Sequence, residues 1–246
     1  MDKGATYKLH IMNIIDLFGG CNQLTTPKRK IKKMVKSKQR TLFEYFWQDI
    51  FKDLPTDPVT KMPILKPFNG YIPERMLPFD EAYRKKETDC IVHFYEDDRR
   101  FLRIFRKPDK YLSFLKKCAL IIEPDLSQFI DMPPQIRAAH AYLNRAIAVY
   151  LQQQGCNMVS NLTWSLRDSY EYSLSGRPQS SIVAVNCTGI LGHDVSMYVW
   201  REGYKNIVLP LHPTQIIRYG DRMPDENTDI SIYFDNERLK RLRHGS

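Results

Sequence analysis

Polar and acidic residues follow the predicted strands of this chain, at the positions where each strand ends. Because the active sites of parallel α/β folds lie at the carboxyl ends of the strands, we expect these side chains to meet at one rim. Clustered carboxylates suit a general acid–base pair or a divalent-metal site, with Asp97 and Asp125 as candidate ligands of Mg²⁺ or Mn²⁺. The candidate catalytic residues are Asp97, Asp98, Asp125, Ser127, Asn161, Trp164 and Asp168.

Several of these acids also have a structural interpretation. An aspartate before an apolar helix is a common N-cap, which would account for Asp97, Asp98 and Asp168. Asp125 fits that interpretation less well, because it lies between a predicted strand and a loop well before the next helix. His93 lies among apolar neighbours and is interpreted as a core histidine. The sequence has no Walker loop, GxGxxG, GxSxG or HExxH pattern, which argues against a glycine-rich phosphate cradle and against serine hydrolysis.

Strand-like and helix-like patterns alternate along the body of the chain and place these residues. Strands are predicted over 90–95, 119–123, 158–164, 181–187, 214–219 and 230–234, and helices over 98–117, 134–154 and 167–174. Repeated strand–helix units predict parallel strands with crossover connections. The fold class is therefore α/β, with a partial or compact barrel-like parallel sheet. An open doubly wound sheet is the alternative, and the carboxylate-rich loops after the strands favour the barrel.

Length and composition indicate one α/β domain with extensions. The chain has 246 residues, 43% of them hydrophobic and 26% charged, which is ordinary for a globular protein. We expect an N-terminal segment and basic arm over 1–50, an irregular wrapping segment over 51–78, the α/β domain over 79–236 and a basic tail over 237–246. No apolar run approaches the ~20 residues of a membrane-spanning helix. The five cysteines form no CxxC pair and suit a reducing compartment such as the cytoplasm.

The net charge of +9 is concentrated near the ends of the chain. Eight basic residues and no acid occupy positions 28–40, a charge density typical of a nucleic-acid-binding arm. A solubilising linker is the alternative. The candidate nucleic-acid-binding residues are Lys28, Arg29, Lys30, Lys32, Lys33, Lys36, Lys38 and Arg40.

A short pattern at the end of this arm resembles the peptide by which many proteins bind the PCNA sliding clamp. Gln39 is followed by an aliphatic residue three positions on and by two aromatic residues six and seven positions on. In such peptides the aliphatic and aromatic side chains fill an apolar pocket of the clamp. The candidate partner-binding residues are Gln39, Leu42, Tyr45 and Phe46. Anchoring of the arm to the domain core is the alternative.

Residues throughout the body match the pattern of one known family in the same order. They include Phe79-Asp80-Glu81, Val92-His93-Phe94-Tyr95, Asp97-Asp98, Pro124-Asp125-Leu126-Ser127, Asp131-Met132-Pro133, Asn144-Arg145, Leu151-Gln152, Asn161, Trp164, Gly176, Pro178, Val183-Ala184-Val185, Thr188 and Tyr219-Gly220. On these residues the chain resembles the domain-of-unknown-function 4417 family of bacteria, phages and mobile elements. The resemblance implies a prokaryotic or viral cytoplasmic setting and supplies no catalytic residues, because the family has no assigned activity.

Three functions follow as alternatives, and they leave open whether the protein is an enzyme. The first is a phage or mobile-element protein that acts on or beside nucleic acid, to which its basic arm tethers it. The second is a divalent-metal-dependent hydrolase or nuclease that uses the strand-end carboxylates. The third is a non-catalytic interaction protein that binds a sliding clamp or a host factor.

Overall fold

The computed structural model describes residues 49–224 and 230–236. Its centre is a sheet of seven parallel strands whose order in the sheet is their order in the sequence. The strands are β1 (Met76–Pro78), β2 (Ile91–His93), β3 (Leu120–Ile122), β4 (Met158–Asn161), β5 (Ile182–Asn186), β6 (Gln215–Tyr219) and β7 (Ser231–Phe234). This arrangement confirms the predicted α/β class.

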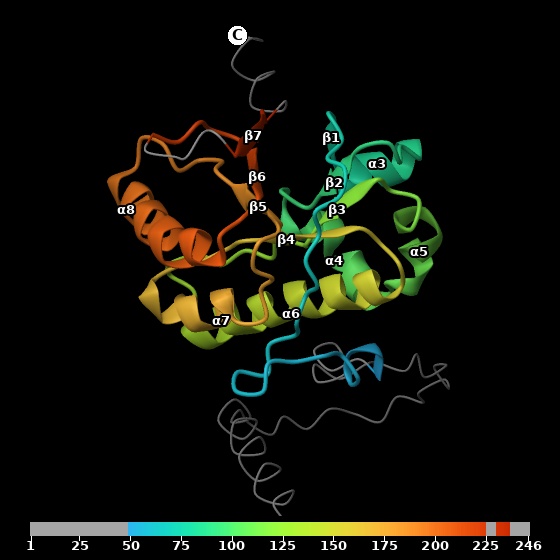
Figure 1. Cartoon of the computed structure of the whole chain (residues 1–246), viewed down its shortest axis with the longest axis horizontal. Coiled ribbons are helices and arrows are strands. Elements are labelled where there is room, and N and C mark those ends of the chain that lie inside the picture. Colours follow the sequence, from blue (N-terminus) through green and yellow to red (C-terminus); the bar gives the residue numbers. More distant parts are fainter. Residues whose placement is uncertain (1–48, 225–229, 237–246) are drawn as a thin grey trace, which may run out of the picture. The chain divides into compact units, whose positions relative to one another are not determined.

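Helices connect the strands and cover the outer face of the sheet (Figure 1). They are α3 (Phe79–Lys85), α4 (Asp98–Arg106), α5 (Asp109–Leu115), α6 (Pro134–Gln153), α7 (Tyr170–Leu174) and α8 (Asp194–Gly203), with short helical turns at Asp49–Phe51, Arg167–Ser169, Tyr204–Val208 and Leu209–Leu211. Pro108 separates α4 from α5, because proline lacks the N–H that a continuous helix needs. Gly155, with φ of +91°, lies just beyond the end of α6.

The sheet curls into a nearly closed, barrel-like structure. The aromatic rings of His93 on β2 and Tyr219 on β6 approach to 4.7 Å between centroids, although three strands separate β2 from β6 in the sheet. The barrel is open between β1 and β7 (Figure 1). The predicted barrel-like sheet, which the carboxylate-rich loops favoured over an open sheet, is therefore confirmed.

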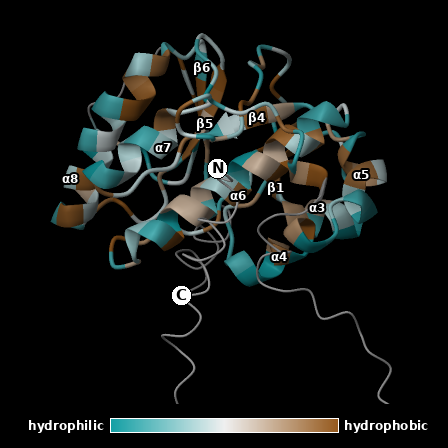
Figure 2. Ribbon diagram, turned by 90° about the horizontal axis from the view of Figure 1, so that it is seen from below, coloured by the Kyte–Doolittle hydropathy of each residue, from teal (hydrophilic) through white to brown (hydrophobic). Residues whose placement is uncertain are grey.

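Successive residues of each strand point to opposite faces and so build separate cores. The barrel interior is filled by the buried side chains of Ile91, Leu120, Ile122, Val159, Ile182, Ala184 and Ile217. Two further apolar clusters lie between the outer face of the sheet and the helices. The covering helices carry hydrophilic and hydrophobic residues in alternation (Figure 2), as amphipathic helices do. Within the described residues, no helix is both long and apolar enough to cross a bilayer.

One regular element lies in the segment that we predicted to be irregular. Met76–Pro78 forms β1, which pairs in parallel with β2 from Met76 opposite Ile91 to Pro78 opposite His93. Three residues are too few to show the alternation of a half-buried strand, and proline is tolerated because β1 is an edge strand. Cross-strand pairing, which a local pattern does not reveal, therefore defines this strand.

Candidate functional site

A pocket of about 460 Å³ opens at the carboxyl ends of the strands, where the sequence predicted the rim. Its size is within the ~300–1,000 Å³ that is usual for small-molecule sites. The loops after β2, β3, β4 and β5 line it, together with one face of α8. The polar and aromatic lining residues include Tyr95, Glu96, Asp125, Ser127, Gln128, Phe129, Thr163, Trp164, Asn186, Thr188 and Trp200.

Asp125 lies in this pocket within a network of neutral hydrogen-bonding groups. The side-chain amide of Asn161, the last residue of β4, donates from Nδ2 to Asp125 Oδ1 over 2.9 Å. The side chain of Asn186, the last residue of β5, also hydrogen-bonds to Asp125. Two predicted candidates, Asp125 and Asn161, are therefore in direct contact.

The surroundings of Asp125 raise its pKa to about 7. The main cause is desolvation, because burial disfavours the charged carboxylate. The hydrogen bonds from Asn161 and Asn186 oppose this effect, whereas the negative charges of Asp98 and Glu123 add to it. A carboxyl group with this pKa exchanges a proton at neutral pH, which is the property of a general acid–base residue.

Tyr95 holds Asn161 in the orientation in which its side-chain amide contacts Asp125. The Tyr95 hydroxyl donates to Asn161 Oδ1 over 2.9 Å, so the amide nitrogen of Asn161 faces the carboxyl group. Burial keeps the pKa of Tyr95 well above its usual value, and the phenol therefore stays protonated as a donor. The backbone N–H of Tyr95 donates to Nδ1 of His93 over 3.1 Å, and burial lowers the pKa of His93 to about 3. His93 is thus the neutral core histidine that we predicted.

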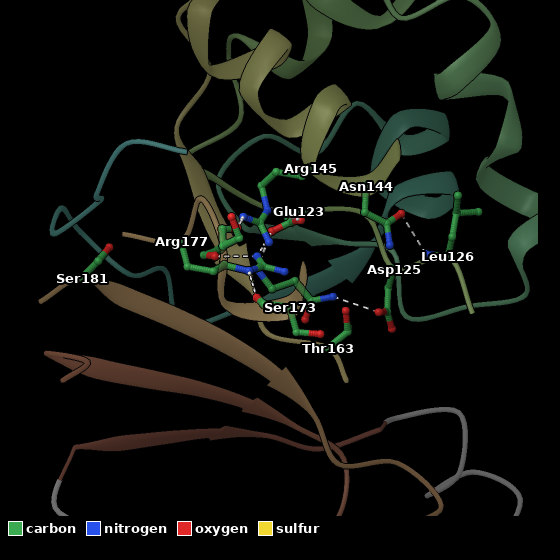
Figure 3. Close-up of polar contacts among 12 residues, drawn as sticks. Glu123, Asp125, Leu126, Asn144, Arg145, Thr163, Ser173, Arg177 and Ser181 are labelled. Atoms are coloured by element: carbon green, nitrogen blue, oxygen red, sulfur yellow. Dashed lines mark hydrogen bonds and ion pairs between the residues drawn. The ribbon is translucent and has the colours of Figure 1, made fainter. Parts of the chain in front are cut away.

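Behind this network, a buried ion cluster fixes the ends of β3 and β4. Figure 3 shows the guanidinium groups of Arg145 and Arg177 converging on Glu123. Arg145 Nε donates to Glu123 Oε1 over 3.0 Å, and Arg177 Nη1 donates to Glu123 Oε2. Glu123 Oε2 also accepts the backbone N–H of Asn161 over 3.1 Å. Glu123 therefore positions the residue that contacts Asp125.

Two further predicted residues stabilise the loop that carries Asp125. Asp98, the first residue of α4, accepts hydrogen bonds from the backbone N–H of Ser127 over 3.3 Å and from its hydroxyl over 3.1 Å. Ser127 itself lines the pocket. Asp98 therefore connects α4 to the loop after β3 and, through its charge, raises the pKa of Asp125.

Trp164 forms part of the pocket wall and is held there by α8. Its indole Nε1 donates to the backbone oxygen of Val199 over 3.0 Å, and its ring lies 5.1 Å from that of Trp200. A Cβ atom at Gly203 would lie 1.9 Å from Nε1 of Trp164, so only glycine fits at this position of α8. The indole ring is thus fixed by close packing.

The other two predicted acids have partners elsewhere. Asp97 caps α4 by accepting the backbone N–H of Arg99 over 3.0 Å, and it forms an ion pair with the same arginine. Asp168 forms an ion pair of 2.5 Å with Arg137. Neither acid lines the pocket with Asp125, so the expected metal pair of Asp97 and Asp125 is not brought together. Within the described residues, no three His, Cys, Asp or Glu side chains form a metal-binding group.

Three residues of the site were not among the candidate residues predicted from the sequence. Tyr95, Glu123 and Asn186 lie at or just after the ends of their strands, and so carried the same positional signal as Asp125. The candidate nucleic-acid-binding residues of 28–40 and the clamp-peptide residues of 39–46 lie outside the described residues.

Comparison with known proteins gives a family and two relatives. A family model described as "Domain of unknown function (DUF4417)" matches residues 54–237. The "Gene 1 protein" of Mycobacterium phage L5 is 24% identical over 173 residues, which cover 69% of this chain and 75% of that protein. The "Gene 1 protein" of Mycobacterium phage D29 is 24% identical over 194 residues, which cover 75% of this chain and 71% of that protein. No solved structure matches the chain.

Proposed function

The chain belongs to the DUF4417 family of phage-associated proteins, and we propose that it is an enzyme that acts on nucleic acid or on a nucleotide at the mouth of its barrel. Asp125 is the general acid–base residue in this proposal. The observation that carries it is a carboxyl group with a pKa of about 7 in a pocket of small-molecule size. Such a group both accepts and donates a proton at physiological pH.

The residues around Asp125 support a role in proton transfer. Asn161 fixes the direction of the carboxyl group, and Tyr95 fixes Asn161. Because these partners are neutral, they hold the group in place without the strong shift toward the ionised form that an arginine would cause. The guanidinium groups of Arg145 and Arg177 form ion pairs with Glu123 instead.

The nucleic-acid part of the proposal comes from the basic residues of 28–40 and from the phage origin of the two relatives. Eight positive charges without an intervening acid suit the phosphate backbone, which is bound with little dependence on sequence. The arm would hold the protein on the polymer while the pocket takes the reacting group. Sliding-clamp binding through 39–46 and Mg²⁺ or Mn²⁺ binding stay predictions from the sequence.

The test is chemical analysis of nucleic acid after incubation with the full-length protein. Single-stranded and duplex DNA and RNA are digested to nucleosides and compared by mass spectrometry. Loss of an acid–base group costs roughly 10²–10⁴ in rate, so Asp125→Asn should lower product formation at least about a hundredfold. Asp89→Asn is the matched control, because Asp89 is exposed and precedes β2 at the other end of the strand. Equal products from wild type and Asp125→Asn, or none from either, would refute the proposal.

A further inference from the structure

Two residues that line the pocket contain an oxygen atom with no hydrogen-bond partner within the described residues. These atoms are Oε1 of Gln128 and Oγ1 of Thr188, and both are shielded from solvent. The other end of the Gln128 amide is engaged, since Nε2 donates to Thr163 Oγ1 over 2.8 Å. Buried polar atoms are nearly always paired in native structures. Because these two oxygens are shielded from the pocket as well as from bulk solvent, the polar group that a ligand meets in the pocket is the carboxyl group of Asp125, which lines the pocket and is partly exposed.

The charge of the pocket limits what that ligand carries. Its lining contains no Lys, Arg or His among the described residues, and its two acids are Glu96 and Asp125. Glu96 is balanced by Arg100 at 3.6 Å, but that guanidinium group does not line the pocket. Phosphate sites are normally built from cationic side chains or from several backbone N–H groups. A phosphate or carboxylate in this pocket would face carboxyl groups instead, so the lining suits an uncharged group better than an anion.

Aromatic rings provide flat apolar surface on one side of the pocket. The indole N–H of Trp164 is already bonded to Val199, so its ring is available for stacking without leaving a polar atom unpaired. Phe129 also lines the pocket, and 61% of its surface is exposed. Stacking of a base on an aromatic side chain contributes about 1–3 kcal/mol. A planar ligand would use these surfaces better than an aliphatic one.

A second cavity of about 560 Å³ adjoins the first and shares five lining residues with it. The shared residues are Gln128, Phe129, Ile130, Trp164 and Val199. The cavity extends over Asp131 and Ser165. A ligand held in the first pocket therefore has room to continue past Trp164.

We propose that the pocket binds an uncharged nucleobase, whose polar edge meets Asp125 and whose ring stacks on Phe129 or Trp164, while sugar and phosphate stay outside. This inference rests on the proposed function and names the part of the substrate that enters the site. A base is planar, which suits the aromatic surfaces, and uncharged, which suits a lining without cationic side chains. Its edge carries the hydrogen-bond donors and acceptors that would meet the carboxyl group. The base comes from a free nucleoside or from an unpaired position of a polynucleotide.

Calorimetric titration of the full-length protein tests the inference with probes of defined charge. The probes are the common nucleosides, their 5′-monophosphates, inorganic phosphate, an aliphatic diamine and a short single-stranded oligonucleotide. At least one nucleoside should bind, its monophosphate should bind no more than about threefold tighter, and phosphate and diamine should not bind. If no free nucleoside binds but the oligonucleotide does, and high salt weakens that binding, the base comes from the polymer.

Side-chain variants locate the binding in the pocket. Asp125→Ala removes the carboxyl group that meets the base, and should weaken nucleoside binding about tenfold. Phe129→Ala should weaken it by a similar factor through lost stacking. Tyr71→Ala is the matched control, because Tyr71 is an aromatic residue with 69% of its surface exposed and does not line the pocket. It should leave the affinity unchanged.

Three results would overturn the inference. The first is that phosphate or a monophosphate binds more than tenfold tighter than the nucleoside. The second is that the diamine binds in preference to the nucleoside. The third is that no base binds, either as a nucleoside or within the oligonucleotide. The outcome is separate from that of the proposed function. If a nucleoside binds but no altered product forms from nucleic acid, the base site stands and the enzymatic proposal fails. If Asp125→Asn abolishes a product although no base binds, the enzymatic proposal stands and the base site fails.

Discussion

Replacement of Asp125 by Asn should change how the stability of the protein depends on pH. The carboxyl group has a pKa of about 7 in the folded protein, against 3.8 in its ordinary state. Between these values the folded protein holds a proton that the unfolded chain releases. The stabilisation by this proton is fully present below about pH 4 and is lost as the pH rises through 7. Each pH unit corresponds to 1.36 kcal/mol, so about three units give at most about 4 kcal/mol.

The measurement is urea unfolding of wild type and Asp125→Asn from pH 4 to pH 8. Asn is neutral throughout, so the variant should lose none of this stabilisation. The free energy of unfolding of the variant, relative to that of wild type, should therefore rise by up to about 4 kcal/mol across the range. Taking the difference between the two proteins removes the contributions of the other titrating groups.

Asp97→Asn provides a control whose stability difference should stay nearly constant over this pH range. Hydrogen bonds from Arg99 hold the pKa of Asp97 below its usual value of 3.8, so the stabilisation by ionised Asp97 is lost only as the pH falls below about 4. A stability difference for Asp125→Asn that does not vary with pH would show that Asp125 titrates as an ordinary carboxyl group. A difference that falls with rising pH would show that its ionised form is the stabilised one. Either result would refute our account of its surroundings.

Four other predictions follow. Deletion of 27–40 should remove most nucleic-acid affinity and flatten a log–log salt dependence whose slope in wild type is roughly −7, from ~0.9 per phosphate contact; unchanged binding would make the arm a linker. Double replacement of Tyr45 and Phe46 by Ala should abolish co-elution with a sliding clamp at unchanged melting temperature, whereas a large drop in melting temperature would assign them to the core. Millimolar Mg²⁺ or Mn²⁺ should raise the melting temperature of wild type more than that of Asp125→Asn if Asp125 binds a cation, and an equal response would exclude it as a ligand. Glu123→Gln should lower the free energy of unfolding by about 3–5 kcal/mol, because it leaves two buried guanidinium groups without a counter-ion, and a loss below about 1 kcal/mol would contradict the role of this cluster.

Much of the barrel could be predicted because its signals are local. The apolar run of β5 indicates a strand buried on both faces, Pro108 ends α4, and Gly155 follows the end of α6. The edge strand β1 could not be predicted, since its three residues gain strand structure only by pairing with β2.

For the candidate site, the sequence predicted where in the fold the residues lie but not which partners they contact. The rule that polar residues gather at the carboxyl ends of parallel strands located Asp125 and Asn161 correctly. It does not tell which way a side chain turns once the chain has left the strand. Glu123 turns toward the arginines of the outer layer, Asp125 turns into the pocket, and Asp168 pairs with Arg137. These choices depend on partners that are distant in the sequence.

The central claim is that Asp125 exchanges a proton near neutral pH within a ligand-binding pocket, and carboxyl ¹³C NMR tests it directly. In protein labelled at the aspartate carboxyl carbons, one resonance should titrate near pH 7, be absent from Asp125→Asn and shift when a bound nucleoside is added. An Asp125 resonance that titrates near pH 4 and does not respond to any nucleoside would contradict the claim.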